Sequence, residues 1–168
     1  MNADHTFSCK KILLAEDDPR DVELTLAALA EHQLANEVMV THDGAEALDY
    51  LFRRGAFLGR TGGHPVAILL DLKMPRVNGL EVLRILKADP ELKTIPIIML
   101  TSSREEPDLT QCYQLGVNAY VVKPVDFVEF MDAVKGLGVF WVAINEPPPI
   151  SRAQPETAAG ATDGEVAS

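Results

Sequence analysis

The chain has 168 residues, of which 47% are hydrophobic, and its formal net charge is −10. This length and composition predict one globular domain with a substantial core, and they exclude a wholly disordered chain. The acidic balance argues against a nucleic-acid-binding function, because contacts to phosphates need a basic face.

The first half of the chain alternates short apolar runs with segments of helical periodicity. Strands are predicted at Lys11 to Ala15, Glu37 to Thr41 and Val66 to Leu70. Asp18-Pro19 starts the first helix with a capping carboxylate and a proline at the first helical position. Asp43-Gly44 opens the second helix. The order is therefore strand, helix, strand, helix, strand.

The second half continues the same alternation. Strands are predicted at Ile95 to Leu100 and at Ala119 to Val122. Helices are predicted around Leu80 to Leu86, from Leu109 to Leu115, and from Asp126 onward. Five strands that alternate with five helices predict an α/β fold with a doubly wound parallel sheet.

The chain is expected to divide into three segments. Residues 1–10 form an N-terminal arm, residues 11–146 form the globular domain with an extended last helix, and residues 147–168 form a disordered tail rich in Pro, Ala and Gly. No run has the length of a signal peptide or a membrane span. Cys9 and Cys112 are expected to be free thiols in a reducing compartment. These features predict a cytoplasmic protein with no membrane partner.

Polar residues follow four of the five predicted strands. They are Glu16 and Asp17 after the first strand, Asp71 after the third, Thr101 after the fourth and Lys123 after the fifth. Ligands bind outside the carboxyl ends of parallel strands, where the strand order reverses, so we expect these side chains to converge in one crevice. Three acids, a hydroxyl and an amine suit a divalent metal ion and a phosphoryl group.

The same segments resemble the signature of response-regulator receiver domains of two-component signalling. The resemblance is carried by Leu14 to Asp18, by Leu70 to Pro75 with Asn78-Gly79, by Leu100 to Ser102, and by Tyr120 to Pro124. It implies a flavodoxin-like sheet with strand order 2-1-3-4-5. It also implies that the domain of residues 11–146 is a stand-alone response regulator, which signals by binding another protein.

The resemblance implies that Asp71 is the phosphoacceptor. Its carboxylate would take a phosphoryl group from a sensor histidine kinase and form an acyl phosphate. Asp17 and Asp71 would supply carboxylates to Mg²⁺, and Lys73 would supply its main-chain carbonyl. Glu16 would hold a water molecule bound to the metal.

The remaining residues of the pattern are implied to work as a switch. Thr101 and Lys123 would bind oxygens of the phosphoryl group, and Tyr120 would turn inward as Thr101 moves. Lys73 and Ser103 lie where the attacking water passes in related receivers, so they are expected to tune dephosphorylation.

Two departures from the commonest receiver pattern resemble the small single-domain regulators of bacterial and cyanobacterial phytochrome kinases. They are the long loop from Arg53 to Pro65 and the terminal segment from Phe140 to Pro149. This resemblance implies a phytochrome kinase as partner and a homodimer through the fourth helix, the fifth strand and the fifth helix. The residues expected on that face are Leu109, Tyr113, Phe127, Phe140 and Trp141. A fold-back of Trp141 onto its own domain is the alternative.

Other functions are compatible with parts of the pattern. The chain is expected to be a phosphoacceptor signalling protein and not an enzyme, with self-phosphotransfer and auto-dephosphorylation as its only reactions. A phosphate sink or a constitutive interaction module would use the same fold, but the full set of acids, threonine and lysine argues against a constitutive module with a degenerate pocket. A magnesium-dependent aspartyl-phosphate phosphatase is disfavoured, because such enzymes keep paired acids after the first strand and add a cap domain. Flavin binding is disfavoured because the acids Glu16, Asp17 and Asp18 would repel a cofactor phosphate.

Overall fold

The computed structural model describes residues 11–30, 38–102, 105–123 and 128. The strands are β1 (Ile12–Ala15), β2 (Val38–Thr41), β3 (Ala67–Leu70), β4 (Ile97–Thr101) and β5 (Ala119–Val122). The helices are α1 (Pro19–Ala30), α2 (Gly44–Phe52), α3 (Gly79–Ala88) and α4 (Glu106–Gln114), together with the short 3₁₀ helix η2 (Gly55–Phe57). The predicted alternation of strand and helix is confirmed over these residues.

The five strands form one parallel sheet with the order β2-β1-β3-β4-β5. This order confirms the predicted flavodoxin-like fold. From β1 the chain first moves to one side of the sheet and then, after β2, to the other, so the order reverses between β1 and β3. Ala15 pairs with Leu70 in the register of β1 and β3. The residues that follow these strands are thereby placed next to each other at the carboxyl edge.

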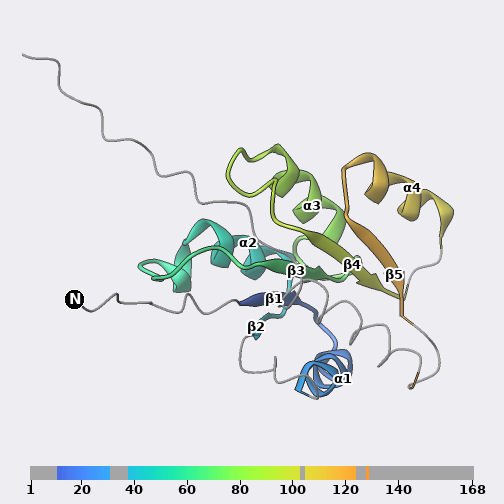
Figure 1. The fold of residues 1–168 in the computed structure, drawn as a ribbon, viewed down its shortest axis with the longest axis horizontal. Coiled ribbons are helices and arrows are strands. Elements are labelled where there is room, and N and C mark those ends of the chain that lie inside the picture. Colours follow the sequence, from blue (N-terminus) through green and yellow to red (C-terminus); the bar gives the residue numbers. More distant parts are fainter. Residues whose placement is uncertain (1–10, 31–37, 103–104, 124–127, 129–168) are drawn as a thin grey trace, which may run out of the picture.

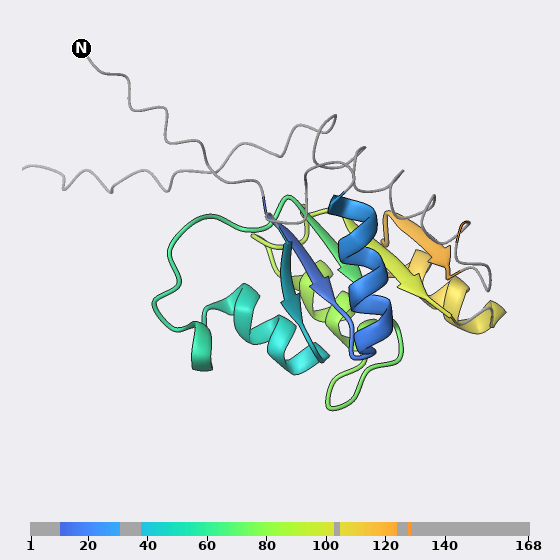
Figure 2. The same ribbon diagram turned by 90° about the horizontal axis from the view of Figure 1, so that it is seen from below.

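Helices cover both faces of the sheet. Figures 1 and 2 show α1 on one face and α2, α3 and α4 on the other. Alternate residues of β1 point to these two layers: Leu13 belongs to the core cluster beneath α2 and α3, whereas Leu14 packs with Ala28 and Leu29 of α1. The strands β1, β3 and β4 are buried throughout, as expected of a parallel sheet between two helical layers.

The clearest differences from the predicted boundaries are in β4 and α4, whereas β1 and β3 each begin one residue later than predicted. β4 begins at Ile97 rather than Ile95, because Pro96 has no N–H to donate to the ladder, and it continues to Thr101, which pairs with Val122. α4 begins at Glu106, three residues before the predicted start at Leu109, with a proline in its first turn.

Several predictions lie outside the described residues. These are the N-terminal arm with Cys9, the helix from residue 126 onward apart from Val128, the tail, and the individual residues Ser103, Phe127, Phe140 and Trp141. Four α-helices are therefore seen in the described ranges, and of the fifth predicted helix only Val128, which is helical, is described. Cys112 is a free, buried cysteine on α4. None of the described helices has the length and apolar character that a membrane span requires.

The loop from Arg53 to Pro65 is folded against α2 by its arginines. Arg53 adopts the left-handed conformation with φ 56° and caps α2 through its backbone N–H. The guanidinium of Arg60 lies 4.1 Å from the ring centroid of Tyr50 and donates to the Tyr50 carbonyl at 3.2 Å. Leu58, in the same loop, is 81% exposed. Figure 2 shows this loop leaving α2 and returning to β3.

Candidate functional site

Three predicted acids meet at the carboxyl edge of the sheet. Glu16 and Asp17 follow β1, Asp71 follows β3, and one carboxylate oxygen of each lies within 4.8 Å of the others. Glu16 and Asp71 are buried, whereas Asp17 is exposed. The structure thus brings together the acids that the sequence predicted to converge.

Backbone hydrogen bonds hold these acids in place by extending the ladder one residue beyond each strand. The N–H of Glu16 donates to the carbonyl of Thr41, and the N–H of Asp71 donates to the carbonyl of Ala15, each at 3.0 Å. Carboxylate oxygens of both acids also accept from the chain that follows them, Glu16 from the N–H of Asp18 and Asp71 from the N–H of Leu72. Their positions therefore follow from the register of the sheet.

The turn after Asp71 depends on a glycine. A Cβ on Gly79 would lie 2.1 Å from the carbonyl oxygen of Asp71, so only glycine allows α3 to start this close to β3. Asn78 caps α3 by accepting from the N–H of Glu81 at 2.9 Å. Lys73, which lies between Asp71 and Asn78 in the sequence, has an exposed side chain.

Lys123 reaches into the acid cluster from the end of β5. Its Nζ lies 2.5 Å from Oε2 of Glu16, 2.6 Å from Oδ2 of Asp21 and 3.8 Å from Oδ1 of Asp71. Its side chain is only 8% exposed. Asp21 was not among the predicted site residues. The available signal was its position in the first turn of α1, four residues after Asp17 in the sequence.

The residues predicted for the switch occupy β4 and β5. Thr101 is fully buried at the end of β4, and its hydroxyl is hydrogen-bonded to the carboxylate of Asp71. Tyr120 is half-buried on β5, opposite Met99 in the register, and packs against the core cluster under α3 and α4. Thr101 is therefore in direct contact with the acid, and Tyr120 lies on the neighbouring strand.

Burial has the largest effect on the pKa of the two buried acids of the cluster. It raises the pKa of Glu16 to about 7, against the opposing hydrogen bond from Lys123. Burial also raises the pKa of Asp71, and the charge of Lys123 opposes it. Burial alone would lower the pKa of Lys123, but its hydrogen bonds to Asp21 and Glu16 outweigh burial and the pKa is raised. Lys123 is therefore protonated and lies among several acids.

The cluster fits a divalent cation. Its donors are carboxylate oxygens, which hard cations such as Mg²⁺ and Mn²⁺ prefer. One ammonium, that of Lys123, faces the carboxylates of Glu16, Asp21 and Asp71. A doubly charged ion would offset the excess negative charge that burial makes costly.

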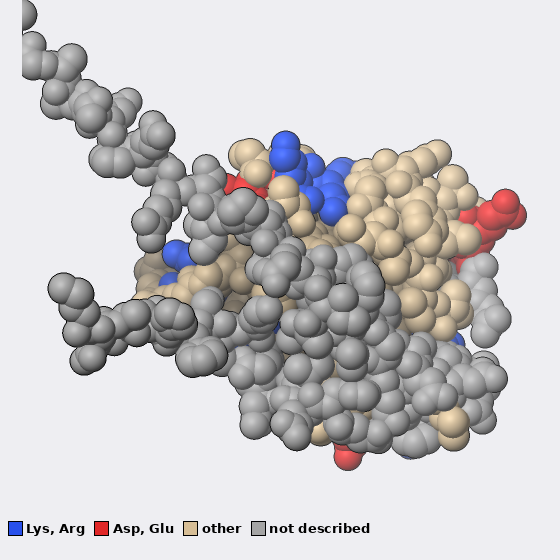
Figure 3. Space-filling model, in the orientation of Figure 1, with Lys and Arg blue, Asp and Glu red and all other residues tan. Residues whose placement is uncertain are grey.

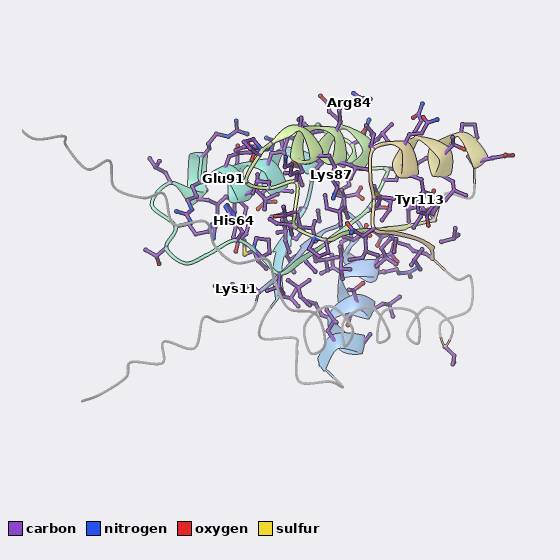
Figure 4. The ribbon with its side chains drawn as sticks, turned by 45° about the horizontal axis from the view of Figure 1, so that its top comes forward. Lys11, His64, Arg84, Lys87, Glu91 and Tyr113 are labelled. Atoms are coloured by element: carbon purple, nitrogen blue, oxygen red, sulfur yellow. The ribbon has the colours of Figure 1, made fainter. Side chains whose placement is uncertain are left out.

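The predicted docking face is described only in part. Leu109 and Tyr113 lie on α4 with 37% and 53% of their surface exposed. Figure 3 shows basic side chains over α3 and an acidic group beyond α4, and Figure 4 shows Arg84 and Lys87 on α3 and Tyr113 on α4. Leu109 and Tyr113 are therefore accessible in the described chain.

Residues 12–135 match the family model of the response regulator receiver domain. The chain belongs to the response-regulator receiver family. Among its relatives is the response regulator Rcp1 of Synechocystis, which is 34% identical over 140 residues, or 83% of this chain and 94% of that protein. Receivers of this family accept phosphoryl groups from histidine kinases, so the chain is a response regulator.

Solved structures agree with this assignment. The phosphorylated cyanobacterial phytochrome response regulator RcpA is 38% identical, with a TM-score of 0.77 over 83% of this chain and 99% of that one. The bacteriophytochrome response regulator AtBRR is 59% identical, with a TM-score of 0.66 over 82% and 98%. A Mn²⁺-bound form of Rcp1 is 34% identical, with a TM-score of 0.75 over 83% and 99%. The predicted resemblance to phytochrome-linked regulators is confirmed.

Proposed function

We propose that this receiver accepts a phosphoryl group from a sensor histidine kinase onto Asp71 and signals through a changed protein-binding face. The observation that carries this proposal is the placement of Asp71. Its carboxylate is buried at the carboxyl end of β3, lies within 4.8 Å of the other two acids, and is 3.8 Å from the ammonium of Lys123. A carboxylate that attacks a phosphoryl group, which is also an anion, needs positive charge nearby to offset the repulsion between them.

Mg²⁺ is the proposed cofactor of the acid cluster. Asp17 and Asp71 would hold it through their carboxylates, Lys73 through its main-chain carbonyl, and Glu16 through a bound water. When bound, the ion lowers the repulsion between the carboxylates and the incoming phosphoryl group. The oxygen donor set and the solved Mn²⁺-bound form of Rcp1 support a divalent ion here.

The reaction forms a bond between an oxygen of Asp71 and phosphorus, and breaks the bond between phosphorus and the imidazole nitrogen of the kinase. The charge of Lys123 and the hydrogen bond from Thr101 counter the effect of burial on Asp71 and so favour its ionised, nucleophilic form. Both groups would then turn to the phosphoryl oxygens, with Thr101 donating its hydroxyl and Lys123 its ammonium. Little more than positioning and charge neutralisation is required.

Movement of Thr101 would carry the signal away from the site. Thr101 ends β4 and pairs with Val122 of β5, and Tyr120 lies two residues before Val122 on that strand. An inward turn of Tyr120 would change the surface of α4, β5 and the following helix, where Leu109 and Tyr113 are exposed. We propose that this face forms a homodimer, with Phe127, Phe140 and Trp141 contributing.

A phytochrome kinase is the proposed phosphodonor, and RcpA and AtBRR, each named as a phytochrome response regulator, support it. Transfer would take place in the cytoplasm. The proposed receiver spans residues 11–146, between the arm of residues 1–10 and the tail of residues 147–168. Auto-dephosphorylation, tuned by Lys73 and Ser103, would reset it.

Phosphorylation with a small donor tests the acceptor. With acetyl phosphate and Mg²⁺, the intact mass of the wild type should increase by one phosphoryl group, and that of Asp71→Asn should not change. Asp18→Asn is the matched control, because Asp18 is an exposed acid that caps α1 through the N–H of Arg20 and is outside the acid cluster. Phosphorylation that survives in Asp71→Asn would assign the acceptor role to another acid.

Transfer from purified kinases tests the partner. An autophosphorylated phytochrome kinase should lose its phosphoryl group to the wild type and keep it in the presence of Asp71→Asn. A histidine kinase with an unrelated sensor serves as the comparison. Equal transfer rates from both kinases would contradict a phytochrome-specific pairing while leaving Asp71 as the acceptor.

A further inference from the structure

The ammonium of Lys123 is engaged before any phosphoryl group arrives. It donates to Glu16 at 2.5 Å and to Asp21 at 2.6 Å, whereas Asp71 lies 3.8 Å away. An ammonium has three donor hydrogens, so two are already used. Because the Lys123 side chain is only 8% exposed, few water molecules can replace its hydrogen bond to Glu16 or to Asp21. To reach an oxygen on Asp71, the nitrogen must move away from these partners.

The two partners of Lys123 differ in their relation to the acid cluster. Glu16 belongs to the cluster, so a bound cation competes with Lys123 for its carboxylate. Asp21 lies outside the cluster, on the first turn of α1, and its side chain is 29% exposed. A cation in the cluster therefore leaves the bond between Asp21 and Lys123 in place. Asp21 becomes the group that opposes the movement of Lys123.

We propose that Asp21 is a positioning residue that holds Lys123 toward α1 in the unphosphorylated protein and so limits how readily Asp71 is phosphorylated. The proposal deepens the proposed function and rests on it. Removal of the charge of Asp21 frees the ammonium to approach Asp71, so phosphorylation becomes faster. The expected increase is about three- to tenfold, a part of what a hydrogen bond between charged groups is worth.

Substitutions at Asp21 provide the first test. The initial rate of phosphorylation by acetyl phosphate with Mg²⁺ is measured for the wild type, Asp21→Asn and Asp21→Glu. Asp21→Asn should be faster, and Asp21→Glu, which restores a carboxylate, should return toward the wild-type rate. Asp18→Asn removes an equal charge from the start of the same helix without contacting Lys123, so it should change the rate less than Asp21→Asn. Equal increases in both Asn variants would overturn the proposal.

A double-mutant cycle separates positioning from a general effect of charge. In a Lys123→Ala background, Asp21→Asn should no longer change the phosphorylation rate, because the group that Asp21 holds is absent. An unchanged acceleration in that background would show that Asp21 acts directly on the incoming phosphoryl group, and the positioning role would be lost.

A measurement without phosphorylation provides an independent readout. The NMR signal of the Lys123 side-chain nitrogen in the metal-free protein should shift in Asp21→Asn and stay in place in Asp18→Asn. Thermal unfolding verifies that each variant is folded, and Asp21→Ser replaces Asp21→Asn if the latter is not. A wild type that is not phosphorylated at Asp71 would refute the proposed function. A phosphorylated wild type with an identical Asp21→Asn would refute only the role of Asp21.

Discussion

Two charged regions of this receiver are organised in different ways. At the carboxyl edge of the sheet, Glu16 and Lys123 are 3% and 8% exposed and come from chain segments 107 residues apart. In the loop from Arg53 to Pro65, the arginines bond to nearby groups of the loop and α2: Arg53 donates to the carbonyl of Gly62, and Arg60 donates to that of Gly63. The first region is buried and long-range, whereas the second is local and largely exposed.

The difference separates charges that serve a ligand from charges that shape the chain. Buried acids with too little positive charge among them cost stability, and a cation or phosphoryl chemistry gives a reason to keep them. Arginines that bond to nearby carbonyl groups hold a loop and need no ligand. Changes in the acid cluster should therefore alter both stability and phosphorylation, and changes in the loop should alter stability alone.

The largest effect is expected from Lys123→Ala. It leaves Glu16, Asp21 and Asp71 without their shared partner, so the free energy of unfolding of the metal-free protein should fall by about 3 kcal/mol. Mg²⁺ should still bind, while the conformational change linked to phosphorylation weakens. Urea denaturation measures the stability. Lys73→Ala is the control, because its ion pair with Glu105 is exposed and worth less than about 1 kcal/mol; equal losses in both variants would contradict the distinction.

A pH effect of similar size is expected from Glu16. Burial raises its pKa in the folded protein to about 7, above the ordinary value of 4.5. The contribution of Glu16 to stability is therefore fully present below pH 4.5 and is lost as the pH rises through 7. The loss should be on the order of 2–3 kcal/mol in metal-free protein.

The difference in stability between the wild type and Glu16→Gln isolates this effect. The free energy of unfolding of Glu16→Gln should rise relative to that of the wild type between pH 5 and pH 8, because the glutamine amide does not ionise. Urea denaturation in the presence of a chelator measures both. If the difference in unfolding free energy between the two proteins is constant over the whole pH range, burial of Glu16 does not make stability depend on pH.

Gly79→Ala tests how the turn after β3 holds the acid. The added Cβ would lie 2.1 Å from the carbonyl oxygen of Asp71, so the turn must shift, at about 2 kcal/mol in the free energy of unfolding. Phosphorylation should slow because Asp71 moves with the turn. Gly63→Ala, in the arginine-rich loop, is matched because a Cβ there meets nothing within 4 Å. A harmless Gly79→Ala would refute the proposed constraint.

The smallest effect is expected from Arg60→Ala in the loop. It removes the contact with the ring of Tyr50 and two hydrogen bonds to carbonyl groups, so stability should fall by about 1 kcal/mol. The phosphorylation rate with acetyl phosphate should not change. Arg84→Ala, on the exposed surface of α3 (Figure 4), should change neither quantity. A slower phosphorylation of Arg60→Ala would connect the loop to the acid cluster.

Much of the fold and of the acid cluster could be predicted from local patterns. Apolar runs that end on polar residues indicated parallel strands, and the position of Asp71 after such a run placed it at the carboxyl edge. The start of α3 was harder, because Asn78 and Gly79 are typical of a turn as well as of a helix cap, and only the packing of Gly79 on the backbone of Asp71 distinguishes the two.

The sequence by itself determined the class of fold and the acids that meet, because side-chain periodicity and strand ends are properties of neighbouring residues. The partners of Lys123 were decided by the tertiary structure. Asp21 precedes it by 102 residues, and nothing in the first turn of a helix indicates which distant ammonium will lie against it. That contact exists because α1 packs on the sheet to which β5 belongs, at a distance set by the whole core.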